Sequence, residues 1–191
     1  MSDTNPLSST QSVLYFAYGA NMHPGQIAGR CGEVEVEVVA VARLPGYALA
    51  FFGRSERWDG GEESAVRQPG SDLWGVLYRL SAAAFDRLDA WQGAKLDGTG
   101  AYFHSPAQVV AADGSGHMAV MYRRSTTREP ALPSTEYLDY VAGAAESRGV
   151  AAGYVEKLRT IDSVKASYPV PKEGPTDRFL ASLPLGASCA C

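Results

Sequence analysis

The sequence predicts a single α+β domain, built mostly of strands with a few short helices. Its 191 residues, 46% of them hydrophobic, are enough for one full core, and this length favours one domain over two. Several stretches alternate apolar and polar residues, as half-buried strands do. Three other stretches have the caps or the apolar spacing of helices. The chain shows no internal repeat and no low-complexity segment.

The expected strands share β-branched and aromatic residues and are bounded by glycine, proline or charged turns. Residues 33–44 alternate glutamate and valine before they become more apolar, which predicts a half-exposed strand. The strands that we expect lie at residues 13–18, 33–44, 47–52, 73–80, 102–111 and 117–124, the last two joined as a hairpin.

Residues 53–64 interrupt this series. They contain three glycines and six charged residues, so we expect a long surface loop that helps to choose the substrate. We interpret Trp58 within it as a local packing anchor, or as a residue that flanks a site.

Two helices are marked by caps at both ends. The first has Ser81 as its N-cap and Gly93 just beyond its end, and the second has Ser134 and Gly149 in the same roles. A third helix is expected over residues 151–161, where apolar residues recur on one face, namely Tyr154, Leu158 and Ile161.

The ends of the chain carry no such pattern. We expect residues 1–12 to form a flexible N-terminal segment, residues 13–162 the domain, and residues 163–191 a tail that wraps the surface, because Pro, Lys and Gly break any period there. The opening residues have no basic and apolar leader, and no window reaches the roughly 18 apolar residues of a membrane helix. We therefore expect a cytoplasmic protein.

Charge and cysteine content exclude several classes of function. The net charge is −4 and the pI is near 5.4, with Lys and Arg scattered singly, which favours neither nucleic acid nor a membrane surface as a partner. Cys31 stands alone, and Cys189 and Cys191 fit neither a disulfide framework nor a zinc site. The three histidines, His23, His104 and His117, share no ligand spacing, so we expect no metal.

The stretch from Val13 to Met22, "VLYFAYGANM", stops a strand at a turn of small residues. Such a turn can leave several backbone N–H groups that point the same way, which makes a seat for an anion. The sequence therefore predicts that an anionic group binds at residues 18–22.

Gln92 is a polar residue on the buried side of the helix that follows Ser81. On a period of 3.6 residues it projects within about 20° of Phe85, and Asp89 lies beside it on the same face. Gln92 is either a helix-end side chain that bonds to nearby backbone or part of a site.

An ordered set of motifs resembles the γ-glutamylcyclotransferase family. "LYFAYGANM" is similar to the family's "YFAYGSN" signature, and the other motifs follow in the family's order between residues 13 and 162, namely "VARLPGYALAF", "GSDLWGVLYRLS", "LDAWQG", "GAYF" and "YVEKLRTI". The resemblance implies a small mixed β-barrel with helices packed around it. It also implies a reaction in which the α-amine of a γ-glutamyl group attacks its own γ-carbonyl and releases 5-oxoproline with an amine or amino acid.

The resemblance also implies where the substrate lies. The turn Tyr18, Gly19, Ala20 and Asn21 would hold the α-carboxylate through its main chain, with Ala20 in place of the usual serine and Asn21 fixing the loop. Tyrosines that line the pocket in relatives match Tyr102, Tyr122 and Tyr137. The reaction needs no cofactor, because the nucleophile is already in the substrate. The sequence does not decide the oligomeric state and leaves a homodimer open.

The departure from the family lies at Gln92, where relatives carry the glutamate that moves the proton. An amide neither takes nor gives a proton at a useful pKa. Three explanations stay open: a natural homologue with another base, for which Asp89 and Asp97 are nearest in sequence; an engineered variant that traps substrate; or a γ-glutamyl or small-metabolite binding protein. If the pocket lacks only its proton carrier, Gln92→Glu should raise turnover at least tenfold, since general acid–base help is worth about 10²- to 10⁴-fold.

Overall fold

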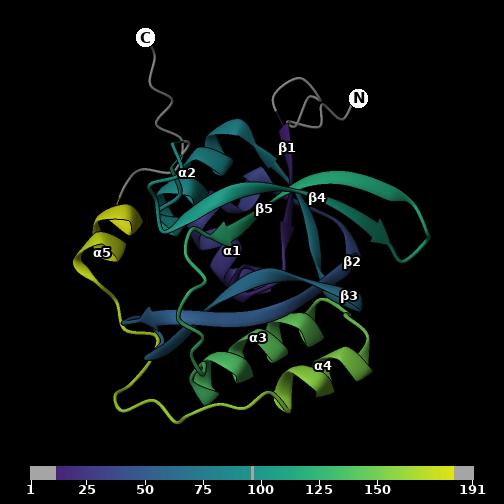
Figure 1. Ribbon diagram of the computed structural model, residues 1–191. Coiled ribbons are helices and arrows are strands. Elements are labelled where there is room, and N and C mark those ends of the chain that lie inside the picture. The colour runs from purple at the N-terminus through teal and green to yellow at the C-terminus, as the bar shows by residue number, and fades with distance from the viewer. Residues whose placement is uncertain (1–11, 96, 183–191) are drawn as a thin grey trace.

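Five strands close into a barrel in the computed structural model, which describes residues 12–95 and 97–182 (Figure 1). Around the barrel the strands follow the order β1, β3, β2, β4, β5. β1 is antiparallel to β3 and meets β5 in parallel, with Tyr15 opposite Val120. The prediction of an α+β fold with a small mixed β-barrel is therefore confirmed. The strands are β1 (Ser12–Ala17), β2 (Val36–Ser55), β3 (Gly60–Ser81), β4 (Tyr102–Ala111) and β5 (Gly116–Arg124).

The long hairpin of β2 and β3 corrects one expectation. Residues 53–64 are not a long loop, because β2 continues to Ser55 and β3 begins at Gly60. Only a tight turn separates them, and Asp59 takes a positive φ of 52° in it. Two of the charged residues that suggested a loop, Glu62 and Glu63, lie on β3 with apolar partners across the ladder: Phe52 lies opposite Glu62, and Phe51 opposite Glu63.

The capped helices form where their caps predict them. α2 (Ala82–Gln92) starts after Ser81, whose hydroxyl accepts from the Ala84 N–H, and ends at Gly93 in the left-handed region with a φ of 58°. α3 (Thr135–Ser147) starts after Ser134 in the same way. α4 (Ala152–Arg159) follows, and it packs through Val155 and Leu158.

Four short helices are not predicted by the sequence pattern. They are the 3-10 helices η2 (Ala20–Met22) and η3 (Glu33–Glu35) and the α-helices α1 (Pro24–Cys31) and α5 (Pro175–Ser182). α1 has two glycines in eight residues, which weakens its helical signal. It begins with Pro24 in the first turn, and His23 caps it by accepting from the Gln26 N–H.

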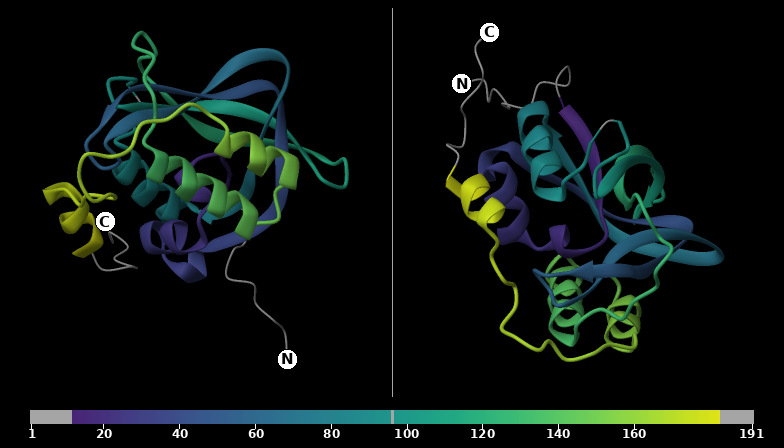
Figure 2. Two further views of the ribbon diagram at one scale, coloured as in Figure 1. Left: turned by 90° about the horizontal axis from the view of Figure 1, so that it is seen from below. Right: turned by 60° about the vertical axis from the view of Figure 1, so that its left-hand side comes forward.

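The core lies inside the barrel and beneath the helices. One cluster joins one face of β1 and β3 to α1, α2, α3 and α4, and the second, around Phe16, Leu73 and Leu77, lies on the opposite face of these strands. α3 and α4 lie side by side against one side of the barrel in both views of Figure 2. Cys31 is a free, buried thiol, and burial raises its pKa to about 12. Cys189 and Cys191 lie outside the described residues.

The segment after α4 runs across the molecule and ends at α5, on the far side from α4 (Figure 2). It is attached to the β2–β3 turn at several points. The Ser167 N–H and hydroxyl both donate to Asp59 at 2.6 Å, and the Lys172 N–H donates to the Arg57 carbonyl at 2.8 Å. The C-terminal part of the described chain is thus held against the turn between β2 and β3.

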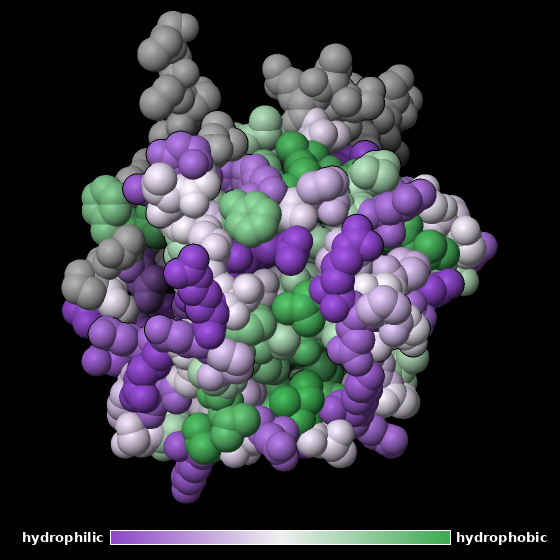
Figure 3. Space-filling view, viewed as in Figure 1, coloured by the Kyte–Doolittle hydropathy of each residue, from purple (hydrophilic) through white to green (hydrophobic). Residues whose placement is uncertain are grey.

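The surface is mixed in character. On the face shown in Figure 3, apolar residues gather near the centre and hydrophilic residues lie along both sides. Among the described residues, no helix has the length and hydropathy needed to cross a membrane.

Candidate active site

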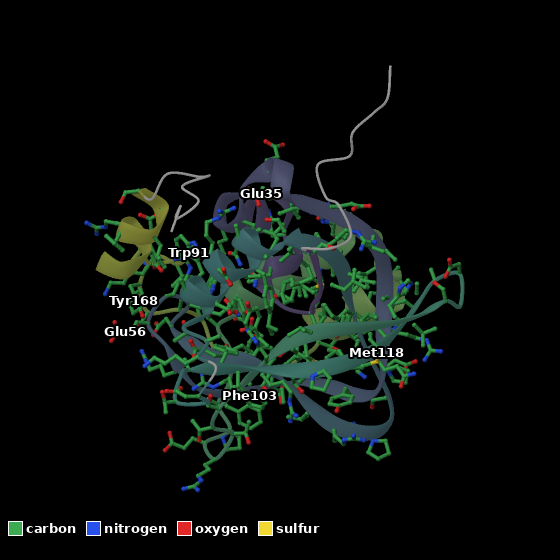
Figure 4. All side chains as sticks on the ribbon, turned by 90° about the horizontal axis from the view of Figure 1, so that it is seen from above. Glu35, Glu56, Trp91, Phe103, Met118 and Tyr168 are labelled. Carbon is green, nitrogen blue, oxygen red and sulfur yellow. The ribbon has the colours of Figure 1, made fainter. Side chains whose placement is uncertain are left out.

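A pocket of about 210 Å³ opens beside the β2–β3 turn. Trp91 at the end of α2 lies on its wall, and Figure 4 places Trp91 on the same side of the barrel as Glu56 and Tyr168, while Met118 lies at the opposite end. The walls carry charges of both signs. The residues around the opening and the walls are Ala20, Arg30, Ser55, Arg57, Trp58, Gly61, Glu62, Glu63, Trp91, Gln92, Ala101, Tyr102, Tyr137 and Asp177.

A second cavity of about 10 Å³ lies at the turn after β1 and shares Glu63, Gln92 and Tyr102 with this pocket, and we call it the inner end of the pocket. Tyr18, Gly19, Asn21, Glu63 and Gln92 all border this end, together with Tyr15, Tyr102 and Tyr122. The structure therefore brings most of the sequence-predicted site residues to one place. Ala20 and Tyr137 border the adjoining part of the same pocket.

Some of the backbone N–H groups in and just after the turn are engaged within the protein. The Met22 N–H donates to the Gly19 carbonyl and the His23 N–H to the Ala20 carbonyl, both at 3.0 Å. The Ala20 N–H donates to the Tyr137 hydroxyl. Binding of a carboxylate at this turn stays a prediction, and these bonds limit the N–H groups that it could use.

A carboxylate side chain of the protein already lies over this turn. A Cβ atom built on Gly19 would come within 2.5 Å of Glu63 Oε1 and 2.8 Å of Glu63 Cγ. Glu63 can approach so closely because Gly19 has no side chain. An anion at Gly19 would therefore lie against the carboxyl group of Glu63, whereas a cationic group would be attracted to it.

Glu63 lies in surroundings that perturb its acidity. Burial raises its pKa above the ordinary value, and hydrogen bonds from Tyr137 and Tyr102 together with the charge of Arg30 oppose this without cancelling it. The Tyr102 hydroxyl also donates to the Glu63 main-chain carbonyl at 3.3 Å. A carboxyl group in a cleft with a raised pKa is a candidate for proton transfer.

Gln92 faces the pocket from the last residue of α2, as its place on the helical stripe predicts. Its Oε1 accepts from Arg30 Nη1 at 3.1 Å, and the same Nη1 donates to Asn21 Oδ1 at 2.8 Å. The Arg30 guanidinium also lies over the Trp91 ring, 5.2 Å from its centroid. Burial and the nearby charge of Arg57 lower the pKa of Arg30.

The remaining predicted residues have different surroundings. Tyr18 donates its hydroxyl proton to the Tyr122 carbonyl and accepts from the Ala65 N–H at 3.1 Å, so this hydroxyl ties β1 to its neighbours. Asn21 donates to the Tyr15 hydroxyl at 3.0 Å and accepts from Gln26 at 3.1 Å, in agreement with a role in fixing the loop. Tyr102 and Tyr137 present their hydroxyls to Glu63.

The two aspartates proposed as alternative bases do not line this pocket. Asp89 accepts from the Tyr122 hydroxyl at 2.5 Å and contacts His104 Nε2 at 2.7 Å, so it joins α2 to β4 and β5. Asp97 is exposed and accepts from the Thr99 N–H at 2.9 Å. Helix geometry correctly put Asp89 on the inner face of α2, where it contacts Tyr122 at the inner end of the pocket, but Asp89 does not itself line the pocket.

The pocket opening is built from the β2–β3 turn and α5. Arg57 pairs with Asp177 at 2.7 Å, and both border the pocket. Trp58 is buried, and its ring centroid lies 4.8 Å from that of Tyr137 and 5.0 Å from that of Tyr140. Both interpretations of Trp58 therefore hold, because it packs on α3 and also flanks the pocket.

Sequence reasoning missed Glu63, Arg30 and Arg57. Glu63 could have been found from its spacing, because a hairpin of residues 47–52 with 60–66 puts it opposite Phe51 on the inner face. Arg30 depends on the short helix α1, which has no strong signal. The described residues contain no cluster of three or more His, Cys, Asp or Glu side chains that could hold a metal ion.

A concave pocket with convergent polar groups is a candidate binding site for a small molecule. Comparisons with known proteins identify the family to which the chain belongs. A model of the AIG2-like family matches residues 72–158. Gamma-glutamylcyclotransferases of Mus musculus and Homo sapiens are 31% and 30% identical to the chain over 156 residues, which is 80% of this chain and 80% of each relative. The chain belongs to the γ-glutamylcyclotransferase family.

Solved structures agree with this membership. A structure of a gamma-glutamyl cyclotransferase superposes with a TM-score of 0.77 and 28% identity, and covers 89% of this chain and 98% of its own. The Bacillus subtilis protein YkqA, at 23% identity and a TM-score of 0.65, covers 83% of this chain and 57% of its own, and shows the fold alone.

Proposed function

We propose that this chain catalyses a γ-glutamylcyclotransferase-type reaction on a small γ-glutamyl compound. The α-amine of the γ-glutamyl group attacks its own γ-carbonyl, a five-membered ring closes, and 5-oxoproline leaves together with an amine or amino acid. The observation that supports this most directly is the pocket itself, in which Glu63, Arg30 and Gln92 converge on the turn after β1.

The charges of the pocket suit a γ-glutamyl end. Such a group carries an α-ammonium and an α-carboxylate on one carbon, and the pocket offers a carboxyl group at Glu63 and a guanidinium at Arg30. Tyr102, Tyr137 and the turn Tyr18–Asn21 would enclose this end, so the amine is held near the γ-carbonyl. Holding the two reacting groups together supplies a large part of the rate enhancement, because closure of a tethered ring avoids a bimolecular encounter.

Gln92 takes the position of the family's glutamate in this proposal. Its amide is held by Arg30 through Oε1, which leaves the Nε2 donors to face the pocket. Gln92 can thus position a substrate carbonyl but cannot carry a proton. This residue also favours the second candidate function, a γ-glutamyl or small-metabolite binding protein with impaired turnover.

Release of 5-oxoproline distinguishes the two functions. The protein is incubated with γ-glutamyl amino acids, γ-glutamyl dipeptides and γ-glutamyl amines, and 5-oxoproline and the freed amine are quantified together. Equimolar release with at least one compound supports the enzyme. Saturable binding by calorimetry with no release supports the binding protein, and neither binding nor release contradicts both.

The reaction needs no metal, because the nucleophile is part of the substrate and leaves with the product. We expect dialysis against a chelator to leave the rate of 5-oxoproline release unchanged. Loss of activity that one added metal restores would contradict this part of the proposal.

A further inference from the structure

We propose that Glu63, on strand β3, carries the proton between the substrate's α-amine and the leaving nitrogen in this chain. This inference rests on the proposed cyclotransferase function and names the residue that performs its proton transfer. Glu63 takes the role for which a carboxyl group at position 92, Asp89 and Asp97 were the other candidates.

Glu63 is the carboxyl group of the pocket that is free to act. Three carboxylates border the pocket, and two of them are ion-paired: Glu62 with Arg124, and Asp177 with Arg57. Glu63 forms no ion pair among the residues that the structure describes. Since a proton carrier must not be neutralised by a fixed partner, Glu63 is the candidate of the three.

The position of Glu63 matches the site at which the amine must lie. Its carboxyl group contacts Gly19, and it borders the inner end of the pocket together with Gln92. A carboxyl group at position 63 and one at position 92 would therefore face the same small space from β3 and from α2. The chain carries its carboxyl group on β3, at Glu63, and an amide on α2, at Gln92.

The surroundings of Glu63 favour its protonated form. Burial shifts its pKa upward from the ordinary value of glutamate. The titratable groups that face it come from β1 and the turn after it, α1, β4 and α3, and they are Tyr15, Tyr18, Arg30, Tyr102 and Tyr137. Burial raises the pKa of all four of these tyrosines, so they stay neutral donors and Glu63 is the group that titrates.

The protons of the step balance with Glu63 and solvent water. The α-ammonium transfers one proton to the Glu63 carboxylate, and its lone pair forms the new C–N bond at the γ-carbonyl. The tetrahedral intermediate collapses as the old C–N bond breaks, and Glu63 returns its proton to the leaving nitrogen. Of the three ammonium hydrogens, one stays on the lactam nitrogen, one reaches the leaving nitrogen through Glu63, and one passes through water to the released amine.

The test compares the unmodified protein with Glu63→Gln and with the matched control Asp72→Asn, which removes an ion-paired carboxylate of the same strand that lies outside the pocket. We expect Glu63→Gln to lower kcat for 5-oxoproline release by about 10²- to 10⁴-fold, and Asp72→Asn to change kcat by less than about threefold. Thermal unfolding of each variant verifies that it is folded.

A pH profile gives a second readout that a structural role would not affect. In the unmodified protein kcat should fall as the pH drops through the pKa of Glu63, and this acid limb should be absent from the residual activity of Glu63→Gln. Glu63→Asp should retain the limb at reduced kcat. Full activity in Glu63→Gln, with an unmodified protein that releases 5-oxoproline, overturns the role of Glu63 and leaves the proposed function intact. An unmodified protein that releases none overturns the proposed function and this inference with it.

Discussion

Gly19 has no side chain, and Glu63 occupies the space that this leaves. An alanine at residue 19 would put a Cβ 2.5 Å from Glu63 Oε1, so the carboxyl group must move aside. Misplacement by about 1 Å can lower a rate about 10²-fold. We therefore expect Gly19→Ala to lower kcat at least about tenfold while the protein stays folded, since the displaced atoms are the end of a flexible side chain.

The matched control for Gly19→Ala is Gly143→Ala in α3, where an added Cβ meets nothing within 4 Å. That change should leave kcat as it is and stabilise the helix by about 0.4–1 kcal/mol. If both variants keep full activity, the contact between Gly19 and Glu63 has no catalytic importance.

Gln92→Glu adds a carboxyl group to the same pocket from helix α2, whereas Glu63 lies on strand β3. If Glu63 already carries the proton, a second carboxyl group beside it adds no missing function, and we expect kcat to change by less than about tenfold. A rise of tenfold or more would mean that the pocket lacks its proton carrier, as the resemblance to the family alone suggests, and would count against Glu63. The measurement is the initial rate of 5-oxoproline release at saturating substrate.

Residue-level prediction from the sequence succeeded where a periodic pattern or a motif was present. Gln92 faces the pocket because a 3.6-residue period puts it near Phe85 on the inner face of α2. Glu63 was missed because the six charges and three glycines of residues 53–64 predict a loop, and the segment has no alternation of apolar and polar residues to indicate a strand. Asp89 shows the limit of periodicity, since the helical face was right but its partners, His104 and Tyr122, come from distant strands.

At the scale of elements, α5 contributes a charged residue to the pocket opening. Asp177 neutralises Arg57 there at 2.7 Å, and both side chains are one quarter exposed. Asp177→Asn should free the Arg57 charge for a substrate whose leaving group is anionic. We expect KM for a γ-glutamyl amino acid to fall by up to about fivefold, given that exposed ion pairs contribute about 0.2–1 kcal/mol.

A γ-glutamyl amine, whose leaving group has no carboxylate, is the control substrate for Asp177→Asn. Its KM should stay unchanged, and steady-state kinetics with both substrates measures the difference. An equal change for both would show that Asp177 acts on the shape of the opening and not through the charge of Arg57.

The helices whose caps are plain in the sequence, α2 and α3, form where expected. α1 and α5 were missed, because each has eight residues and begins at a proline that also predicts a turn. Such short helices obtain their stability from tertiary contacts, which the sequence pattern does not contain. Both matter for the site, since α1 supplies Arg30 and α5 supplies Asp177.

At the scale of the whole molecule, Glu63 links stability to pH. Its pKa is raised on folding, so the folded state binds more protons than the unfolded state between the ordinary pKa of glutamate and the raised one. Its contribution to the free energy of unfolding therefore becomes less favourable as the pH rises through this window. Glu63→Gln removes this contribution.

The difference in free energy of unfolding between Glu63→Gln and the unmodified protein should thus shift in favour of the variant as the pH rises above the ordinary pKa of glutamate. Urea unfolding at several pH values measures it. Carboxylates whose pKa is lowered on folding, such as Asp59 and Glu136, have the opposite dependence, but they are present in both proteins and cancel in the difference. A difference that does not vary with pH would contradict the raised pKa.

The barrel itself could be predicted only through the resemblance to the family. The sequence pattern gives strands and helices, but closure between β1 and β5 depends on a parallel contact between residues 105 positions apart, Tyr15 and Val120. Local alternation carries no information on such pairing. The ordered motifs supplied it, because they identify a family whose fold is known.

We infer that this pocket needs one carboxyl group facing the amine of the substrate, and that the chain supplies this group from position 63 instead of position 92. The double variant Glu63→Gln with Gln92→Glu tests this most directly, because it moves the carboxyl group from β3 to α2 and keeps the charge of the pocket. We expect its kcat for 5-oxoproline release to exceed that of Glu63→Gln alone by at least about tenfold. A folded, substrate-binding double variant that is no more active than Glu63→Gln would contradict the account.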